Sequence, residues 1–252
     1  MSFDVAAEAY DRFMGRYSQL LSPQLADLAG VRGGARALDV GCGPGALTSE
    51  LVTRVGASSV AAVDPSEPFV DAARARNPGV DVRRASAERM PFPDGAFDVA
   101  LAQLVVHLMS DPVAGLAEMA RVTRRDGVLA ACVWDHASSH GPLGLFWGAA
   151  RELDPGVDDE SRLAGTREGH LVELFEAAGV REVEGSVLSV RREHPSFEEW
   201  WEPFTRGVGP AGAYVKTLDA DRQAALREAC RSRIPDGPFV LTARAWAARG
   251  LA

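Results

Sequence analysis

The first 180 residues alternate between short apolar runs and longer stretches in which apolar residues recur every three or four positions. A short apolar run bounded by turn residues predicts a buried strand, and the longer periodicity predicts a helix with one buried face. Strands separated by helices are typical of a parallel, doubly wound α/β sheet with right-handed crossovers. After a first strand that begins at residue 37, we predict strands at 59–64, 80–84, 97–102 and 127–134 and helices at 67–76, 111–123 and 170–178.

The two ends of the chain depart from this alternation. Residues 1–35 carry the apolar periodicity of one or two helices. In the last third, apolar runs at 183–191 and 239–248 predict strands, but no helix of ordinary length joins them. The intervening sequence combines aromatic residues, a Gly/Pro-rich stretch and a helical pattern, which predicts a helical insertion that closes over the sheet. The expected units are an N-terminal helical cover at 1–35, a core at 36–190 and 237–252, and a substrate lid at 191–236, with a further insertion at 135–167.

A glycine-rich turn ends the first predicted strand. Gly41, Gly43 and Gly45 are spaced by two residues, and an amphipathic stretch follows them. Glycine has no Cβ, so it permits positive φ angles and lets a ligand touch the main chain. A helix that starts at the turn directs its free N–H groups toward whatever lies there. The pattern therefore predicts a cofactor-binding turn, and a turn without a ligand is the alternative.

The same residues fit two cofactors. Gly41, Gly43 and Ala46 satisfy the G-x-G-x-x-G/A pattern of dinucleotide-binding folds. The glycines also fit a D-x-G-x-G-x-G turn, in which Asp39 stands two residues before the first of them. A carboxylate there can accept hydrogen bonds from the ammonium group of S-adenosyl-L-methionine, whereas it repels a pyrophosphate. Asp39 therefore favours S-adenosylmethionine over a nicotinamide dinucleotide.

Polar residues also follow the other predicted strands, where ligands bind in open parallel sheets. Asp64 ends the second strand, and a carboxylate there can accept hydrogen bonds from both ribose hydroxyls of either cofactor. Its alternative role is that of an acid at a helix N-terminus. Residues 85–88 follow the third strand and can read the edge of a base. Gln103 follows the fourth strand, where the reacting end of the cofactor is expected.

Taken together, these segments resemble the class I S-adenosylmethionine-dependent methyltransferases, in particular the small-molecule, type 11 branch that includes the quinone-biosynthesis C-methyltransferases. The resemblance implies a Rossmann-like sheet of seven strands with the last strand antiparallel, helical lid insertions, and an enzyme (EC 2.1.1.-) that yields S-adenosyl-L-homocysteine. It covers about residues 8–134 and is carried by Leu38-Asp39-Val40-Gly41-Cys42-Gly43-Pro44-Gly45, by Val63-Asp64-Pro65-Ser66, by residues 87–98 and by residues 121–129.

The resemblance also implies roles for single residues. The glycine turn and its acid lie near the methionine tail, and Asp64 binds the ribose. Phe69 packs on the adenine, and the N–H of Ala87 meets its ring. The family commonly has Asp where this chain has Ser86, so the contact to the adenine amino group is expected to be weaker or rerouted through Glu88. The full expected cofactor-binding set is Tyr10, Arg16, Tyr17, Asp39, Gly41, Cys42, Gly43, Gly45, Asp64, Pro65, Ser66, Phe69, Ser86, Ala87, Glu88, Gln103 and Leu104.

The segment 10–17 enters this set because it brings two tyrosines and two arginines just ahead of the core. It is interpreted as a cover whose tyrosine or arginine reaches the carboxylate of the cofactor. The alternative is a docking helix with solvated arginines.

Methyl transfer needs a general base only when the nucleophile carries a proton that must leave. Histidine suits that role near neutral pH, and His107, His136 and His140 are the candidates. Of these, His107 and His140 are kept as possible catalytic residues, although the apolar neighbours of His107 also favour a packed helix histidine. Trp147, Trp200, Trp201 and Phe204 either line a pocket for the acceptor or attach the insertions to the sheet.

The composition of the chain limits the kinds of binding partner that we expect. The net charge is −8, and acidic and basic residues are interspersed without a lysine or arginine run, which argues against nucleic acid. No apolar run is long enough to span a membrane, and the N-terminus lacks a signal-peptide pattern. The three cysteines lack metal-ligand spacing, so we expect no metal and a reducing, cytoplasmic location.

The predicted function is methyl transfer from S-adenosylmethionine to a small organic acceptor by a monomer or homodimer. The alternatives are an NAD(P)-dependent oxidoreductase and a non-catalytic S-adenosylmethionine-binding module.

Overall fold

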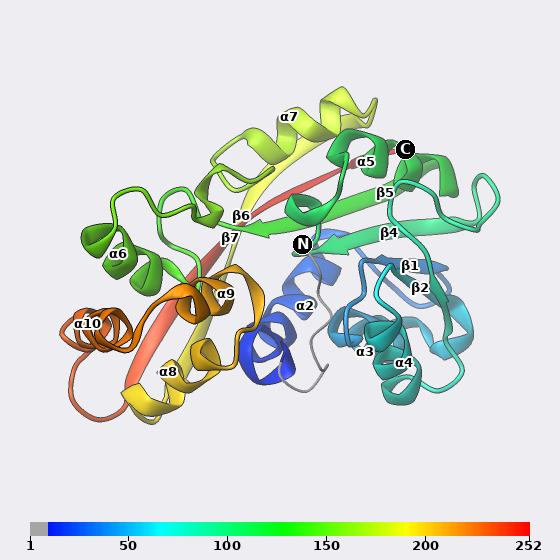
Figure 1. Cartoon of the computed structure of the whole chain (residues 1–252). Helices are drawn as coiled ribbons and strands as arrows, with labels where there is room; N and C mark the ends of the chain where they lie inside the picture. Colours follow the sequence, from blue (N-terminus) through cyan, green and yellow to red (C-terminus); the bar gives the residue numbers. More distant parts are fainter. Residues whose placement is uncertain (1–9) are drawn as a thin grey trace.

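A mixed sheet of seven strands organises the computed structural model, which describes residues 10–252 (Figure 1). The strand order is β3-β2-β1-β4-β5-β7-β6. The first five strands are parallel, and β7 is antiparallel to both of its neighbours. This confirms the predicted doubly wound sheet with its last strand reversed. The strands are β1 (Ala37–Val40), β2 (Val60–Asp64), β3 (Asp81–Arg84), β4 (Phe97–Gln103), β5 (Thr123–Trp134), β6 (Arg181–His194) and β7 (Phe239–Leu251).

The central strands are buried on both faces, as their continuous apolar sequences require. Helices α2, α3 and α4 cover one face, and α5 and α7 cover the other (Figure 1). None of the helices within residues 10–252 is long and apolar enough to cross a membrane. These covering elements are α2 (Arg16–Leu28), preceded by the π-helical turn η1 (Asp11–Gly15), α3 (Ala46–Val55), α4 (Glu67–Arg76), α5 (Pro112–Val122) and α7 (His170–Ala177).

The strand register places the glycine turn and the polar strand ends at one edge of the sheet. Val40 at the end of β1 lies beside Val63, so Gly41 and Asp64 follow adjacent strand ends. The N–H groups of Gly41 and Cys42 both donate to the carbonyl oxygen of Val63, which holds the turn against β2. Parallel register thus builds a single rim from segments that are distant in sequence.

Four helices that insert into the regular alternation pack together beyond this edge, and we call them the helical cap. They share one buried aromatic cluster, in which the rings of Phe146 and Phe204 stack with their centroids 4.5 Å apart. Helix α6 comes from the predicted insertion after β5, and the other three come from the predicted lid segment. The cap consists of α6 (Gly144–Leu153), α8 (Phe197–Thr205), α9 (Gly209–Thr217) and α10 (Ala220–Arg231).

A buried polar chain joins the cap to the sheet and to α2. The hydroxyl of Tyr17 lies 2.8 Å from Nε2 of His194, and Nδ1 of His194 lies 2.7 Å from a carboxylate oxygen of Glu199. Glu199 also pairs with Arg16. Burial lowers the pKa of His194, although the neighbouring Glu199 offsets part of the shift. The chain thus connects α2, the end of β6 and α8 through groups that satisfy one another's hydrogen bonds.

Replacing Tyr17 by phenylalanine tests this connection. The variant leaves a buried nitrogen of His194 without its hydrogen-bond partner. We therefore expect the free energy of unfolding to fall by about 1–3 kcal/mol. The hydroxyl of the half-buried Tyr214 makes no such bond within residues 10–252, and Tyr214→Phe is the control. Urea denaturation measures both; equal midpoints for the two variants would show that the polar chain does not stabilise the fold.

Candidate functional site

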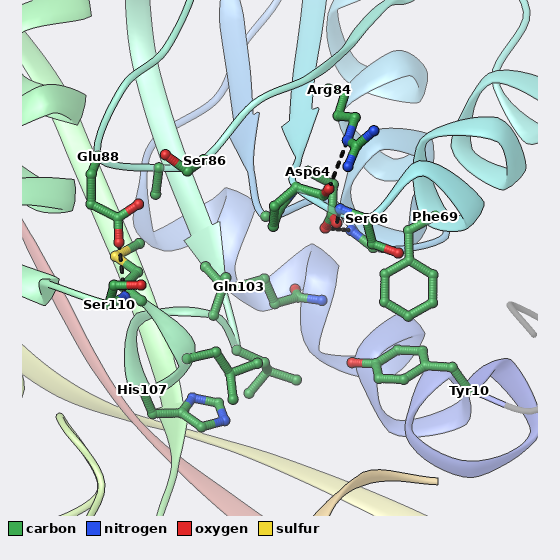
Figure 2. A pocket seen from close by; sticks show the side chains of 18 of the residues that line it. Tyr10, Asp64, Ser66, Phe69, Arg84, Ser86, Glu88, Gln103, His107 and Ser110 are labelled. Carbon is green, nitrogen blue, oxygen red and sulfur yellow. Dashed lines mark hydrogen bonds between the residues drawn. The ribbon is translucent and has the colours of Figure 1, made fainter. Parts of the chain in front are cut away.

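A cavity of about 820 Å³ opens at the carboxyl ends of β1, β2 and β4. Figure 2 shows Gln103 near its centre, with Phe69 and Tyr10 on one side and Ser86 and Glu88 on the other. Its size and position are those of a small-molecule site in an open α/β sheet. The lining residues are Tyr10, Gly41, Gly43, Asp64, Pro65, Ser66, Glu67, Pro68, Phe69, Arg84, Ser86, Ala87, Glu88, Gln103, Leu104, Val105, His107, Leu108, Met109, Ser110 and Leu163.

The glycine turn requires glycine at two positions for different reasons. Gly41 has φ +70°, and a Cβ there would lie 2.3 Å from a methyl carbon of Val105, which is impossible without a shift of the backbone. Gly43 has φ +51°, and a Cβ there would meet no atom within 4 Å. Gly41 is therefore needed for packing, whereas Gly43 leaves bare main chain exposed to the cavity.

Asp64 is held rigidly at the rim. One carboxylate oxygen accepts a hydrogen bond of 2.9 Å from the N–H of Gly43, and the other accepts one of 2.9 Å from the N–H of Ser66. Burial raises the pKa of Asp64, and these two backbone hydrogen bonds oppose the shift. Each oxygen keeps a further lone pair for a ligand hydroxyl. Ser66 stands at the N-cap position of α4, but its side chain makes no capping bond.

Asp39 lies beneath the turn and is 1% exposed. One carboxylate oxygen accepts a hydrogen bond of 2.6 Å from the hydroxyl of Thr48. The other oxygen is buried and has no hydrogen-bond partner among residues 10–252. Burial raises the pKa of Asp39 to about 7, the Thr48 hydrogen bond opposes the shift, and the nearby Asp64 adds to it.

Aromatic groups line one side of the cavity, and a charged acceptor lies on the opposite side (Figure 2). The rings of Tyr10 and Phe69 lie with their centroids 5.4 Å apart at a tilt of 59°. One carboxylate oxygen of Glu88 accepts hydrogen bonds from the N–H groups of Ser110, at 2.8 Å, and Asp111. Burial would raise the pKa of Glu88, but these bonds and others bring it below its usual value. Glu88 is therefore anchored in place as a charged acceptor.

The far end of the cavity contains polar atoms without partners. The side-chain nitrogen of Gln103 donates to the carbonyl oxygen of Ser18 over 3.2 Å, but its buried side-chain oxygen has no partner in the described part of the chain. The same holds for Nδ1 of His107. Burial, with a contribution from His136, lowers the pKa of His107 to about 3, which keeps its ring neutral. Leu104, between them in sequence, has φ +60°, a strained conformation that turns the chain out of β4.

The structure does not bring every residue of the expected set to the cavity wall. Arg16 and Tyr17 belong to the polar chain with His194 and Glu199. Cys42 is buried, and Gly45 packs against α4, where a Cβ would lie 2.6 Å from Asn77. Asp39 lies behind the turn, and the remaining members of the set line the cavity.

The residues expected to act in catalysis or to line an acceptor pocket also lie only in part at the cavity wall. His107 lines the cavity, whereas His140 is 56% exposed and lies 3.3 Å from Asp135. The four aromatic residues expected to line an acceptor pocket, Trp147, Trp200, Trp201 and Phe204, are buried in the aromatic cluster of the cap.

Several lining residues were not predicted from the sequence. Val105, Leu108, Met109 and Ser110 follow closely after Gln103 and Leu104, so their position after a strand end was the available signal. Arg84 likewise ends β3, and its guanidinium donates to the carbonyl oxygen of Pro65. Leu163 arrives from the insertion after β5 and has no local signal.

The residues present fit S-adenosylmethionine. Its ammonium group is complementary in charge to the buried carboxylate of Asp39, which lies behind the turn. Its ribose hydroxyls match the free lone pairs of Asp64, and its adenine matches the aromatic wall formed with Phe69. A pyrophosphate would instead meet two carboxylates next to the turn.

Comparisons with known proteins agree with this geometry. Residues 38–131 match the family model described as a methyltransferase domain. Nocamycin O-methyltransferase from Saccharothrix syringae is 38% identical over 133 residues, which cover 50% of this chain and 48% of that protein. The chain spans about half the length of the curated relatives that it matches.

Solved structures share the fold over nearly the whole chain. A protein from Anaeromyxobacter dehalogenans, proposed to be a type II methyltransferase, has a TM-score of 0.65 at 24% identity and covers 92% of this chain and 95% of its own. The [4+2]-cyclase SpnF has a TM-score of 0.54 at 21% identity, with coverage of 92% and 80%.

The sheet order, the glycine turn and these comparisons define a class I methyltransferase fold. More narrowly, residues 38–131, which are less than half of the chain, match the methyltransferase domain model.

The buried charge of Asp39 predicts a specific pH dependence of stability. Folded protein keeps the proton of Asp39 up to about pH 7, whereas unfolded chain releases it near pH 4. The folded state therefore binds more protons in this window, and stability falls as pH rises through it, by roughly 4 kcal/mol in total. Asp39→Asn removes this loss and is expected to be more stable than wild type at pH 8.

Urea denaturation at pH 4, 6 and 8 measures the difference between variant and wild type. The exposed Asp158 provides the control Asp158→Asn, for which the difference should not change with pH. A constant difference for Asp39→Asn would mean that Asp39 is ionised throughout.

Proposed function

We propose that the protein transfers the methyl group of S-adenosylmethionine to a small organic acceptor and releases S-adenosylhomocysteine. The observation that carries the proposal is one cavity in which the bare turn at Gly43, the anchored carboxylate of Asp64 and the ring of Phe69 converge. Each of these groups suits one part of the cofactor, and their order around the rim follows the strand order. The matched family and relatives support the same reaction class.

The individual roles follow from the contacts of each group. Asp64, oriented by two backbone N–H groups, accepts hydrogen bonds from the ribose hydroxyls. Asp39 balances the charge of the ammonium group. Tyr10 and Phe69, whose rings contact each other, form one wall for the adenine, whose edge meets the main chain at Ala87. This assignment leaves Gln103 and the segment after it for the reacting end.

Methyl transfer requires little more from the protein than the correct positioning of the acceptor and the cofactor. The sulfonium of the bound cofactor supplies an activated methyl group, and an acceptor held in line with it reacts without covalent help from the protein. The wall at Gln103 and His107 offers polar atoms that have no hydrogen-bond partner among residues 10–252. Burial lowers the pKa of His107 to about 3, so its ring is neutral and can accept a hydrogen bond from the acceptor, but it is a weak base.

The acceptor is a small molecule on this proposal. The cavity volume of about 820 Å³ accommodates the cofactor and a compact acceptor. The net charge of −8 disfavours nucleic acid. Because one relative is named an O-methyltransferase, hydroxyl and carboxyl compounds are the first acceptors to test.

Two experiments separate this function from its alternatives. Isothermal titration with S-adenosylhomocysteine and with NADH distinguishes a methyltransferase from an oxidoreductase, and only the former should bind. Transfer of a labelled methyl group from the cofactor to a metabolite extract then distinguishes an enzyme from a binding module. The second step is needed because a cyclase shares the fold. Binding without any labelled product would leave the binding module as the function.

Removing the carboxylate of Asp64 should clearly weaken the binding of the cofactor. Asp64→Ala removes charge-assisted hydrogen bonds worth about 1.5–3 kcal/mol, which predicts a loss of affinity of roughly 10- to 100-fold. Asp71, exposed on the neighbouring helix α4, supplies the control Asp71→Ala. Calorimetry with S-adenosylhomocysteine measures both. Unchanged affinity in Asp64→Ala would remove the ribose role.

A methyl group at Gly43 should block the cofactor without disrupting the fold. Gly43→Ala places a Cβ in open space at positive φ, so it costs about 1 kcal/mol of stability but fills the position where the ligand approaches the main chain. Gly34 also has positive φ and open space but lies away from the cavity, so Gly34→Ala matches the strain alone.

The expected result is a similar small drop in melting temperature for both variants and at least tenfold weaker S-adenosylhomocysteine binding for Gly43→Ala only. Equal affinity in the two variants would show that the ligand does not approach this turn.

A further inference from the structure

A group of three potential metal ligands lies against the far end of the cavity. His107 is in the short 3₁₀ turn η3 (Val106–Leu108) after β4, His136 follows β5, and Glu160 begins the 3₁₀ turn η4 (Glu160–Arg162). One ligand atom of each residue lies within 4.8 Å of those of the other two. The three residues are far apart in sequence, so no spacing motif predicts their meeting.

The polar atoms of this group are poorly satisfied by the surrounding protein. Nδ1 of His107 is buried without a partner in the described chain. Nε2 of His136 lies 4.0 Å from a carboxylate oxygen of Glu160, which is beyond a hydrogen bond. The other oxygen of Glu160 accepts a hydrogen bond of 3.0 Å from the indole N–H of Trp147. Glu160 and His136 are each 6% exposed, so a carboxylate is buried here with one neutral hydrogen-bond donor among residues 10–252.

A divalent cation bound by the three residues would satisfy these polar atoms. Burying a carboxylate is costly unless it is paired or coordinates a metal. Two imidazoles and one carboxylate are the ligand type of catalytic zinc sites, which bind the ion through three side chains and keep the fourth position open. Donor atoms around a tetrahedral ion lie about 3.3 Å apart, so closure by roughly 1 Å would complete the site. The indole of Trp147 would then orient the ligating carboxylate, as such outer hydrogen bonds do.

We propose that His107, His136 and Glu160 bind one divalent first-row transition metal ion at the acceptor end of the cavity. The mixed nitrogen and oxygen set favours Zn²⁺ over Mg²⁺, which prefers oxygen ligands and keeps several waters. His107 lines the cavity, and so does Leu163, which follows η4. Figure 2 shows His107 at the end of the cavity away from Arg84.

The open position of the ion accepts an oxygen or nitrogen donor of the methyl acceptor. This part rests on the proposed function and narrows the acceptor to compounds with such a donor beside the methylated atom. Binding of the ion itself does not depend on the proposed function, so the two are tested separately.

The test uses the purified full-length chain after treatment with a chelator. Titration with Zn²⁺ against a chromogenic chelator should show one tightly bound equivalent. Co²⁺ in place of Zn²⁺ should give the visible absorption of a four-coordinate site. His136→Ala and the isosteric Glu160→Gln should each lower the Zn²⁺ affinity at least tenfold. The exposed His140, outside the group, provides the control His140→Ala with unchanged affinity.

Glu160→Gln keeps the size of the side chain and an oxygen for Trp147, so it reports on the metal even if His136→Ala does not fold. The proposal is overturned if wild type binds no Zn²⁺ tightly, or if wild type and Glu160→Gln bind it equally. S-adenosylhomocysteine binding is measured on the same samples. Zn²⁺ binding without S-adenosylhomocysteine binding supports the metal site and contradicts the proposed function, and the reverse result overturns the metal site alone.

Discussion

The turn after β1 can pass directly beneath the segment after β4 because residue 41 has no Cβ. The side chain of Val105 occupies the space where that carbon would lie. This contact joins two strand ends into the floor of the cavity. On it depend the exposed main chain at Gly43, the position of Asp64 over the turn, and the strained exit from β4 at Leu104. A larger residue at position 41 would separate the cofactor side of the cavity from its acceptor side.

The second constraint is the placement of acidic groups in a buried region. Asp39 and Asp64 lie close enough for each charge to disfavour the other, and burial raises the pKa of both. Such an arrangement costs stability in the free protein and is relieved by a positively charged ligand. The cavity is thus better suited to a cationic cofactor than to an anionic one, which is the physical reason to prefer S-adenosylmethionine over a dinucleotide.

The part of the cavity wall formed by the strand ends could be predicted from the sequence because its information is local. Gly41, Asp64 and Gln103 each follow a recognisable apolar run, and the parallel topology brings such strand ends together. The number of strands and the reversed last strand followed from the family resemblance, whereas the strand order was not predicted. Element limits were less accurate where pairing decides them: β6 continues to His194, beyond the predicted end at residue 191, because β7 pairs with it that far.

The acceptor side could not be predicted because it depends on contacts between distant segments. Trp147 reaches Glu160 because η4 folds back toward α6, and Tyr17 meets His194 across 177 residues of sequence. Neither pair has a spacing or a periodicity that local sequence could reveal. The sequence is equally consistent with the aromatic residues of the cap lining a pocket or forming a core. The structure places them in a core.

The most direct test of this account is the number of protons released when S-adenosylhomocysteine binds near pH 7, measured by calorimetry in buffers of different ionisation enthalpy. Because Asp39 is half protonated at that pH, a ligand ammonium that lowers its pKa should release about half a proton per molecule bound. Asp39→Asn should release none. No heat of binding, or the same heat in every buffer for the wild-type protein, would contradict the claim that the turn and its buried acid bind this cofactor.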